Sequence, residues 1–254
     1  MVSIDRSKFP LKQLFGVSVF AGSFSQLQDL FAAQLSREQS EIMCVAALNA
    51  EIVVQDSQDE QLAQDLQQCD FALPDGMGLV FAARWSGAQL ERIAGVDAVR
   101  ILLEYCAEHK LPTLVIGGRG YASVTAKRQL EEWGTVWLEG YANVSQPTEA
   151  EEREVAKVLR KLKPAVVFVA FGAPKQEHWI ATHMSLLTES SVKIAIAVGG
   201  SFDFLLGKVV RAPQWVQNLG LEWLFRLWQE PWRWRRQLRL VQFFALALKQ
   251  RKAS

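Results

Sequence analysis

Short runs of β-branched and other apolar residues alternate along the chain with longer stretches in which apolar residues recur at helical spacing. The strand-like runs are Glu41–Leu48, Thr113–Ile116, Thr135–Leu138, Ala165–Ala170 and Val192–Val198. The helix-like stretches are Phe24–Ser36, Glu60–Cys69, Val96–His109, Ala122–Trp133, Thr148–Leu162 and Gln176–Leu187, with Thr148 as an expected N-cap. Apolar strands without polar alternation are typical of a parallel sheet covered on both faces. The pattern therefore predicts an α/β fold, with a Rossmann-like, mostly parallel sheet and helices on both faces.

The composition of the chain changes near Arg211-Ala212-Pro213. Five of the nine tryptophans follow this point, namely Trp215, Trp223, Trp228, Trp232 and Trp234. Residues 215–254 carry six Arg and two Lys against two Glu, a charge of +6, so residues 1–214 carry −5 of the net +1. We therefore predict a Rossmann-like catalytic core over residues 1–210 and a helical, basic and aromatic C-terminal appendage over residues 211–254.

The appendage is expected to meet an anionic membrane surface, because basic residues are attracted to anionic headgroups and tryptophan favours the interface. Two alternatives stay open at this point: an amphipathic helix that packs on the core, and a tail that binds nucleic acid. The sequence contains no recognised nucleic-acid-binding module, so no nucleic-acid partner is expected. A homo-oligomer is compatible with the sequence, which does not set the oligomeric state.

Cysteine usage and the N-terminus bear on location. Cys44, Cys69 and Cys106 form no C-x-x-C pair and are expected to be buried free thiols in a reducing compartment. Met1–Phe9 is polar and mixed in charge, unlike a signal peptide, and the chain has no run of about 18 apolar residues. We expect a cytoplasmic protein that lies peripherally on the inner face of the cell membrane.

Glycine and polar residues follow four of the predicted strands: Asn49, Gly117-Gly118, the run Gly172–Glu177, and the run Gly199–Asp203. Ligands of open α/β sheets bind beyond the carboxyl ends of the strands, so these residues are expected to form one polar rim. Gly117 and Gly118 either let backbone N–H groups approach a phosphate or form a plain turn. The run Gly172–Glu177 is either part of a pocket or a helix start with proline in its first turn.

Two further motifs could carry chemistry. Asp75, in Leu73-Pro74-Asp75-Gly76-Met77-Gly78, is either part of a simple turn or a general base for transfer to a hydroxyl group. Arg226, Arg233 and Arg236 are spaced by seven and three residues and could share a helical face if the kink at Pro231 is mild. Arginine side chains suit the geometry of a pyrophosphate.

Taken in order, these motifs resemble the WecG/TagA/CpsF family, also called glycosyltransferase family 26. The matching pieces are Leu48-Asn49-Ala50-Glu51, Leu73–Gly78, Arg92-Ile93-Ala94-Gly95-Val96-Asp97, Ile116-Gly117-Gly118, Gly172–Glu177, Val198–Asp203, Arg211-Ala212-Pro213, and Leu221–Arg226 through Pro231 and Arg233. The resemblance covers roughly residues 15–245, and eight pieces in order are a specific signal.

The resemblance implies an inverting, metal-independent hexosyltransferase that acts in cell-surface polysaccharide synthesis. Its donor would be a UDP-sugar, with N-acetylmannosamine or another hexose, and its acceptor an undecaprenyl-diphosphate-linked sugar on the cytoplasmic leaflet. Asp75 looks like the catalytic base of the family, while Asn49, Arg92 and Gln176 look like pocket residues. The appendage arginines that complete the site would be Arg226, Arg233 and Arg236, and the remaining predicted substrate-binding residues are Gly117, Gly118, Gly199, Gly200 and Asp203.

No metal ion or other cofactor is expected. The chain has no Asp-x-Asp pair, and His109, His178 and His183 form no ligand cluster with the cysteines. Arginines and helix N-termini would then stabilise the leaving UDP.

One position departs from the family, which usually has threonine two residues before the asparagine, where this chain has Ala47. Either the sugar or acceptor differs, or activity is reduced, and the alternative function is therefore a catalytically weakened nucleotide-sugar-binding protein of the same fold. A nicotinamide-dependent oxidoreductase would require a dinucleotide fingerprint, which the sequence lacks.

Overall fold

The computed structural model describes residues 9–38, 41–118, 121, 123–231 and 234–253. Within this part of the chain, eight strands form one sheet in the order β1-β2-β4-β3-β8-β7-β5-β6. The strands are β1 (Leu11–Leu14), β2 (Val17–Phe20), β3 (Met43–Leu48), β4 (Phe71–Pro74), β5 (Thr113–Gly117), β6 (Thr135–Leu138), β7 (Val166–Ala170) and β8 (Ile194–Ala197). β1 is antiparallel to β2, and the other neighbours are parallel, so the predicted mostly parallel α/β sheet is confirmed.

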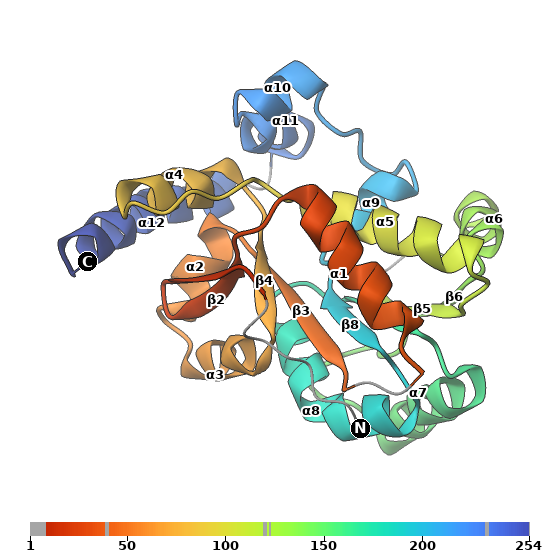
Figure 1. The fold of residues 1–254 in the computed structure, drawn as a ribbon. Coiled ribbons are helices and arrows are strands. Elements are labelled where there is room, and N and C mark those ends of the chain that lie inside the picture. Colours follow the sequence, from red (N-terminus) through yellow and green to blue (C-terminus); the bar gives the residue numbers. More distant parts are fainter. Residues whose placement is uncertain (1–8, 39–40, 119–120, 122, 232–233, 254) are drawn as a thin grey trace.

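Helices cover both faces of the sheet (Figure 1). One face is packed by α1 (Phe24–Ser36), α5 (Gly95–Glu108), α6 (Val124–Glu132) and α9 (Ser201–Leu205). The other is packed by α2 (Ala50–Asp56), α3 (Glu60–Gln68), α4 (Met77–Trp85), α7 (Glu149–Leu162) and α8 (Lys175–Glu189). Successive residues of β3 point to opposite faces, with Cys44 in one hydrophobic core and Val45 in the other. The three cysteines are buried and free, as predicted.

The predicted strands and helices are all present, with ends that shift by up to two residues. The cap of α7 is confirmed, because Thr148 Oγ1 accepts from the Glu151 N–H and the Glu151 carboxylate accepts from the Thr148 N–H at 2.8 Å. The sequence analysis did not predict the β1–β2 hairpin, whose two-residue turn places Phe15 at a positive φ beside Gly16. Such turns usually carry Asn, Asp or Gly at this position, so the usual signal is absent.

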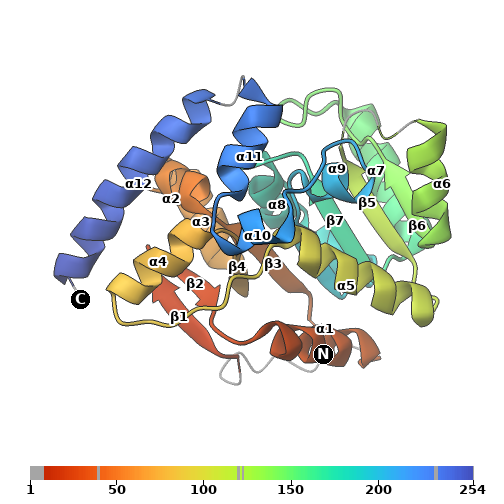
Figure 2. The same ribbon diagram turned by 90° about the horizontal axis from the view of Figure 1, so that it is seen from above.

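The helices after residue 210 lie beyond the carboxyl ends of the strands and beside the helices of one face. Figure 2 shows α10 (Gln214–Asn218) and α11 (Glu222–Gln229) over the sheet, and α12 (Trp234–Ala253) along one side beside α2 and α4. Phe243 and Ala247 of α12 are buried in the core that α2 and α4 share. Arg239 Nη1 forms an ion pair with Glu51 Oε1 of α2 at 2.9 Å. No helix in the described ranges combines the length and apolar character that crossing a bilayer requires.

Candidate active site

A cleft of about 970 Å³ opens over the carboxyl ends of the parallel strands. Ten of the residues predicted from sequence line it: Asn49, Asp75, Arg92, Gly117, Gly118, Gln176, Gly199, Gly200, Asp203 and Arg226. Arg233 and the side chain of Arg236 lie outside the described part of the chain. The structure therefore brings together residues that are up to 177 positions apart, from Asn49 to Arg226.

The strand order sets the order of side chains along the cleft. Reading from β4 through β3, β8, β7 and β5 to β6, the strand ends carry Asp75, Asn49, Gly199, Gly172 and Gly117, and then the loop 139–144. The side chains of α4 and α12 line the cleft at the β4 end. The two ends of the cleft therefore differ in chemistry, with Asp75 and Asn49 near the apolar helices and the glycines further along.

Asp75 follows β4 directly, where its backbone N–H donates to Leu48 O at 2.9 Å. Burial raises the pKa of its carboxyl group to about 6, and the Glu222 carboxylate adds to this increase. The Arg92 guanidinium, the Gly95 N–H and Arg211 lower the pKa, but they offset the effect of burial only in part. A base is most effective when its pKa lies near the working pH. Its place in the cleft and its raised pKa make Asp75 a candidate for a general base.

Gly95, Ser201 and Ala47 lie around the Asp75 carboxylate. A Cβ atom added to Gly95 would lie 3.4 Å from Ser201 Oγ, 3.7 Å from Asp75 Oδ2 and 3.9 Å from the Ala47 Cβ. Ser201 Oγ donates to Val198 O at 2.7 Å, which fixes the hydroxyl group in this space. The side chain at position 47 therefore lies near the candidate base, and as alanine it contributes no polar group there.

A network of ion pairs fixes α11 over the cleft. Arg92 Nη2 forms an ion pair with Glu222 Oε2 of α11. Arg211 donates through both Nη atoms to Asp97 of α5, at 2.6 and 2.8 Å, and its Nε lies 3.6 Å from Glu222 Oε1. Such bidentate arginine–carboxylate pairs restrict geometry as well as adding energy. The first turn of α11 is therefore tied to α5 and to the loop that precedes it.

Arg226 lies one helical turn further along α11. Its guanidinium carbon is 4.7 Å from the centre of the Phe204 ring, and its Nε donates to Glu230 at 2.9 Å. A Cβ atom on Gly200 would lie 3.3 Å from Arg226 Nη2. Because Gly200 has no side chain, the Arg226 guanidinium can lie close to the loop that follows β8.

Two amide side chains of the predicted site use much of their capacity within the protein. Asn49 Oδ1 caps α2 by accepting from the N–H groups of Glu51 and Ile52, at 3.0 and 3.1 Å. Gln176 Oε1 accepts from Gly172 N at 3.1 Å and Gly199 N at 2.9 Å, and its Nε2 donates to Glu177. Gln176 therefore ties the loops after β7 and β8 together. Asn49 uses its side-chain oxygen as a cap, so its Nδ2 group is the part of the side chain left to donate to a ligand.

Gly117 ends β5 and Gly118 follows it, with φ of 95° and 75°, where residues other than glycine are strained. A Cβ atom on Gly118 would lie 1.9 Å from the Tyr121 ring, so any other residue here would force that ring to move. The Tyr121 hydroxyl donates to Asp203 at 3.2 Å. This hydrogen bond ties the Asp203 carboxylate to Tyr121, which also lines the cleft.

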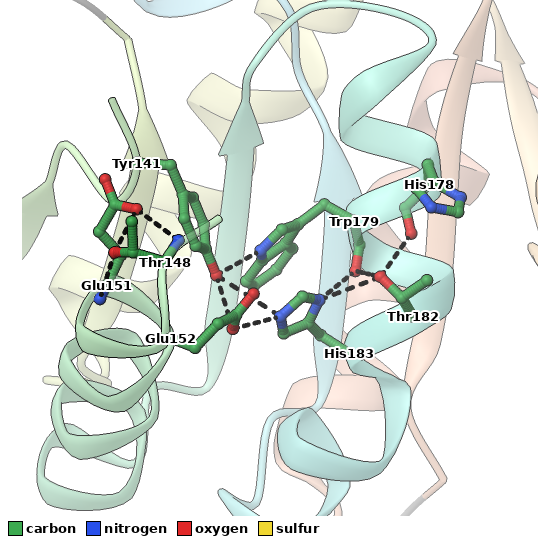
Figure 3. Close-up of polar contacts among 8 residues, drawn as sticks. All are labelled: Tyr141, Thr148, Glu151, Glu152, His178, Trp179, Thr182 and His183. Atoms are coloured by element: carbon green, nitrogen blue, oxygen red, sulfur yellow. Dashed lines mark hydrogen bonds and ion pairs between the residues drawn. The ribbon is translucent and has the colours of Figure 1, made fainter. Parts of the chain in front are cut away.

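The loop after β6 closes the opposite end of the cleft, and Figure 3 shows how it is held. The Tyr141 hydroxyl accepts from Trp179 Nε1 of α8 at 2.9 Å and donates to Glu152 of α7 at 3.1 Å. His183 Nε2 lies 3.0 Å from the same Glu152 carboxylate, and its ring stacks on Trp179. Glu151 accepts from the Ala142 N–H at 2.8 Å. The loop is therefore fixed by both helices beneath it.

Comparisons with known proteins agree with this geometry. A family model described as "Glycosyl transferase WecG/TagA/CpsF family" matches residues 12–254. The chain belongs to the WecG/TagA/CpsF family of glycosyltransferases. It is 32% identical over 210 residues to an N-acetylglucosaminyldiphosphoundecaprenol N-acetyl-beta-D-mannosaminyltransferase of Bacillus subtilis (strain 168), covering 82% of this chain and 80% of that protein. A protein of the same name from Bacillus spizizenii (strain ATCC 23059 / NRRL B-14472 / W23) is 32% identical over 219 residues, which are 85% of this chain and 83% of that protein.

The sequence analysis missed several residues that line the cleft of this WecG/TagA/CpsF glycosyltransferase. Ser201 and Glu222 lie within the motifs but were not selected as site residues. Arg239 was counted only as appendage charge, although it lines the cleft and pairs with Glu51. No spacing signal could have found Arg239, because only the packing of α12 on α2 places it there.

Among the described residues, no three or more His, Cys, Asp or Glu side chains are grouped so that they could hold a metal ion. Among the residues that the structure describes, the basic side chains that line the cleft are Lys175, Arg92, Arg226 and Arg239. These side chains can bind anionic groups of a substrate.

Proposed function

We propose that this chain transfers a sugar from a UDP-sugar to a diphosphate-linked sugar on a polyprenyl carrier, in the synthesis of a cell-surface polysaccharide. The observation that carries the proposal is Asp75, a carboxyl group with a pKa of about 6 in a cleft that Arg92 and Arg226 also line. The names of both relatives support it, since each specifies an N-acetylmannosaminyl group and a diphosphoundecaprenol acceptor.

The proposed reaction is a single displacement with inversion. The Asp75 carboxylate accepts the proton of the acceptor hydroxyl group, and the hydroxyl oxygen attacks the anomeric carbon of the donor sugar. The bond from that carbon to the UDP oxygen breaks, and its electron pair leaves with UDP. Arginine side chains stabilise the negative charge that develops on the diphosphate. Two arginines of the cleft are suited to this role: Arg92, which pairs with Glu222 of α11, and Arg226, whose guanidinium group lies over the Phe204 ring of α9.

We propose that this reaction does not require a divalent metal ion. The cleft-lining arginines Arg92, Arg226 and Arg239 supply positive charge for the diphosphate groups. Enzyme treated with EDTA and desalted should keep its full rate. Loss of activity that Mg²⁺ or Mn²⁺ restores would contradict this part of the proposal.

The proposed location is the cytoplasmic face of the membrane, where a nucleotide sugar and a lipid carrier can meet. Trp215 and Trp228 of the appendage are 65% and 78% exposed, which is unusual for side chains of this size. Tryptophan favours the headgroup region, and nearby basic residues add attraction to anionic lipids. The exposed Trp215 and Trp228 therefore support peripheral attachment of the protein to a membrane.

The direct test is a transfer assay with purified protein, UDP-N-acetylmannosamine and an N-acetylglucosaminyl-diphosphate-lipid acceptor. A disaccharide-diphosphate-lipid with a β linkage, formed from the α-linked donor, would support both the activity and inversion. If no UDP-sugar supports transfer, the proposed activity is wrong.

Ala47 favours one second candidate, a protein that binds nucleotide sugars with little catalysis. Its side chain borders the Asp75 pocket but offers no hydroxyl group. This candidate predicts UDP binding without measurable transfer, and a gain of transfer in Ala47→Thr. Full activity of the unaltered chain would remove it.

A further inference from the structure

One end of the cleft is apolar. Met77 and Phe81 of α4, Leu240 and Phe244 of α12, and Trp223 of α11 line it. Each helical pair is spaced by four residues, which places its two side chains on the same helix face. Phe81, Phe244 and Trp223 are each 42–43% exposed, so these rings face open space and not the core. Accessible apolar surface within a cleft is typical of a binding site.

The walls of this apolar end are anchored to the core. Phe243, next to Phe244, is completely buried, and a Cβ atom on Gly78 of α4 would lie only 3.5 Å from its ring. The Trp85 and Phe244 rings of α4 and α12 are 6.2 Å apart. Because residue 243 enters the core while residue 244 faces the cleft, α12 is oriented by its packing. The exposed ring of Phe244 is therefore a fixed feature of the wall.

The apolar end adjoins the part of the cleft that would hold a sugar and a diphosphate. Met77 lies two residues after Asp75, and Arg239 of α12 directly precedes Leu240. A candidate base, an arginine and a group of aromatic and aliphatic side chains therefore line the same part of the cleft. A lipid-linked acceptor carries the matching groups: a reactive sugar, a diphosphate and an isoprenoid chain.

We infer that the apolar end between α4, α11 and α12 binds the first isoprenoid units of the acceptor's lipid carrier. The inference rests on the proposed function and deepens it, since the enzyme would bind the lipid chain within its cleft as well as approaching the membrane surface. Isoprenoid units are branched hydrocarbons without polar atoms, so they match walls made of Met, Leu, Phe and Trp.

The test uses two water-soluble acceptors, which separate binding in the cleft from attachment to a membrane. Both carry the same sugar diphosphate, one as a geranyl ester and the other as a methyl ester. The unaltered protein should use the geranyl acceptor with a kcat/KM at least about tenfold higher, because burial of several methylene groups favours it. The double variant Phe81→Ser/Phe244→Ser should reduce this ratio to about two or less. Comparing ratios cancels any general loss of activity.

The matched control is Val241→Ser/Leu248→Ser on α12, at positions that are 72% and 50% exposed and do not line the cleft. This control should retain the full ratio. Single variants at Phe81 and Phe244 are measured in parallel, in case the double variant does not fold, and each should lower the ratio by about threefold. The inference is overturned if the unaltered protein uses both acceptors equally, if the cleft variants retain the ratio, or if the control variant loses it to the same extent. Failure of the unaltered protein to use either acceptor would instead refute the proposed function and the inference with it.

Discussion

Glu222 of α11 forms an ion pair with Arg92, and both side chains line the cleft that contains Asp75. The pair joins the appendage to the candidate base, because Arg92 lowers the pKa of Asp75 while Glu222 raises it. Glu222 also lies 3.6 Å from Arg211, which is bound to Asp97 of α5. Docking of α11 therefore affects both the position of Arg92 and the charge around Asp75.

The role of Asp75 is tested by Asp75→Asn, which keeps the shape of the side chain but removes its basicity. Transfer should fall by about 10²–10⁴-fold, the usual loss for a general base. UDP affinity, measured by calorimetry, should stay within about threefold, because the nucleotide would bind through other groups. Near-normal turnover would exclude Asp75 as the base.

The Glu222–Arg92 pair predicts a change in the pH profile. Since Asp75 must be deprotonated to act as a base, kcat/KM should rise with pH through a midpoint near 6. In Glu222→Gln the carboxylate that raises the pKa of Asp75 is gone, so the midpoint should move to lower pH. The rate above the midpoint should also fall, because Arg92 loses its partner.

The control for this experiment is Glu132→Gln on α6, whose exposed side chain pairs with Arg128 and does not line the cleft. Its midpoint should match that of the unaltered protein. A midpoint that is the same in Glu222→Gln and in the control would show that Glu222 does not act on Asp75.

Glu177 predicts a pH dependence of stability that is independent of catalysis. Its side chain is 1% exposed, Oε1 accepts from Gln176, and Oε2 has no hydrogen-bond partner in the described structure. Burial raises the pKa of this carboxyl group to about 7. The raised pKa means that the folded protein favours the protonated form of Glu177. The resulting contribution to the free energy of unfolding is complete below the ordinary pKa of a carboxyl group and is lost as pH rises through about 7.

Glu177→Gln should therefore leave Tm nearly unchanged at pH 5 and raise it at pH 8. From the size of the pKa shift, the gain in the free energy of unfolding at pH 8 is roughly 3 kcal/mol. Thermal unfolding at several pH values measures it. A constant difference in Tm between pH 5 and pH 8 would show that the Glu177 charge is not the cause.

Membrane attachment is tested through the exposed tryptophans of the appendage. Trp215→Ser/Trp228→Ser should reduce binding to anionic liposomes by about tenfold or more, because two large apolar side chains no longer enter the headgroup region. Val136→Ser, at an exposed position of the edge strand β6, is the control and should bind like the unaltered protein. Equal sedimentation of all three proteins with liposomes would exclude these tryptophans as the attachment surface.

The local sequence determined the elements whose signals are local. Periodicity predicted the longer helices and five strands, and Thr148 with Glu151 marked the start of α7 because a capping box needs only four consecutive residues. The motifs at the strand ends also indicated seven residues of the cleft, since parallel strands must bring their carboxyl ends to one edge, whereas Arg92 was indicated only by the family resemblance.

Only the tertiary structure decided which partners these residues meet. The strand order placed Asp75 next to Asn49 and far from the loop 139–144, and no local pattern specifies an order of strands. Packing of α11 brought Glu222 to Arg92 across 130 positions, and packing of α12 placed Arg239 and Phe244 in the cleft. The pKa of Asp75 likewise follows from burial and from charges on separate segments, which exist together only in the folded chain.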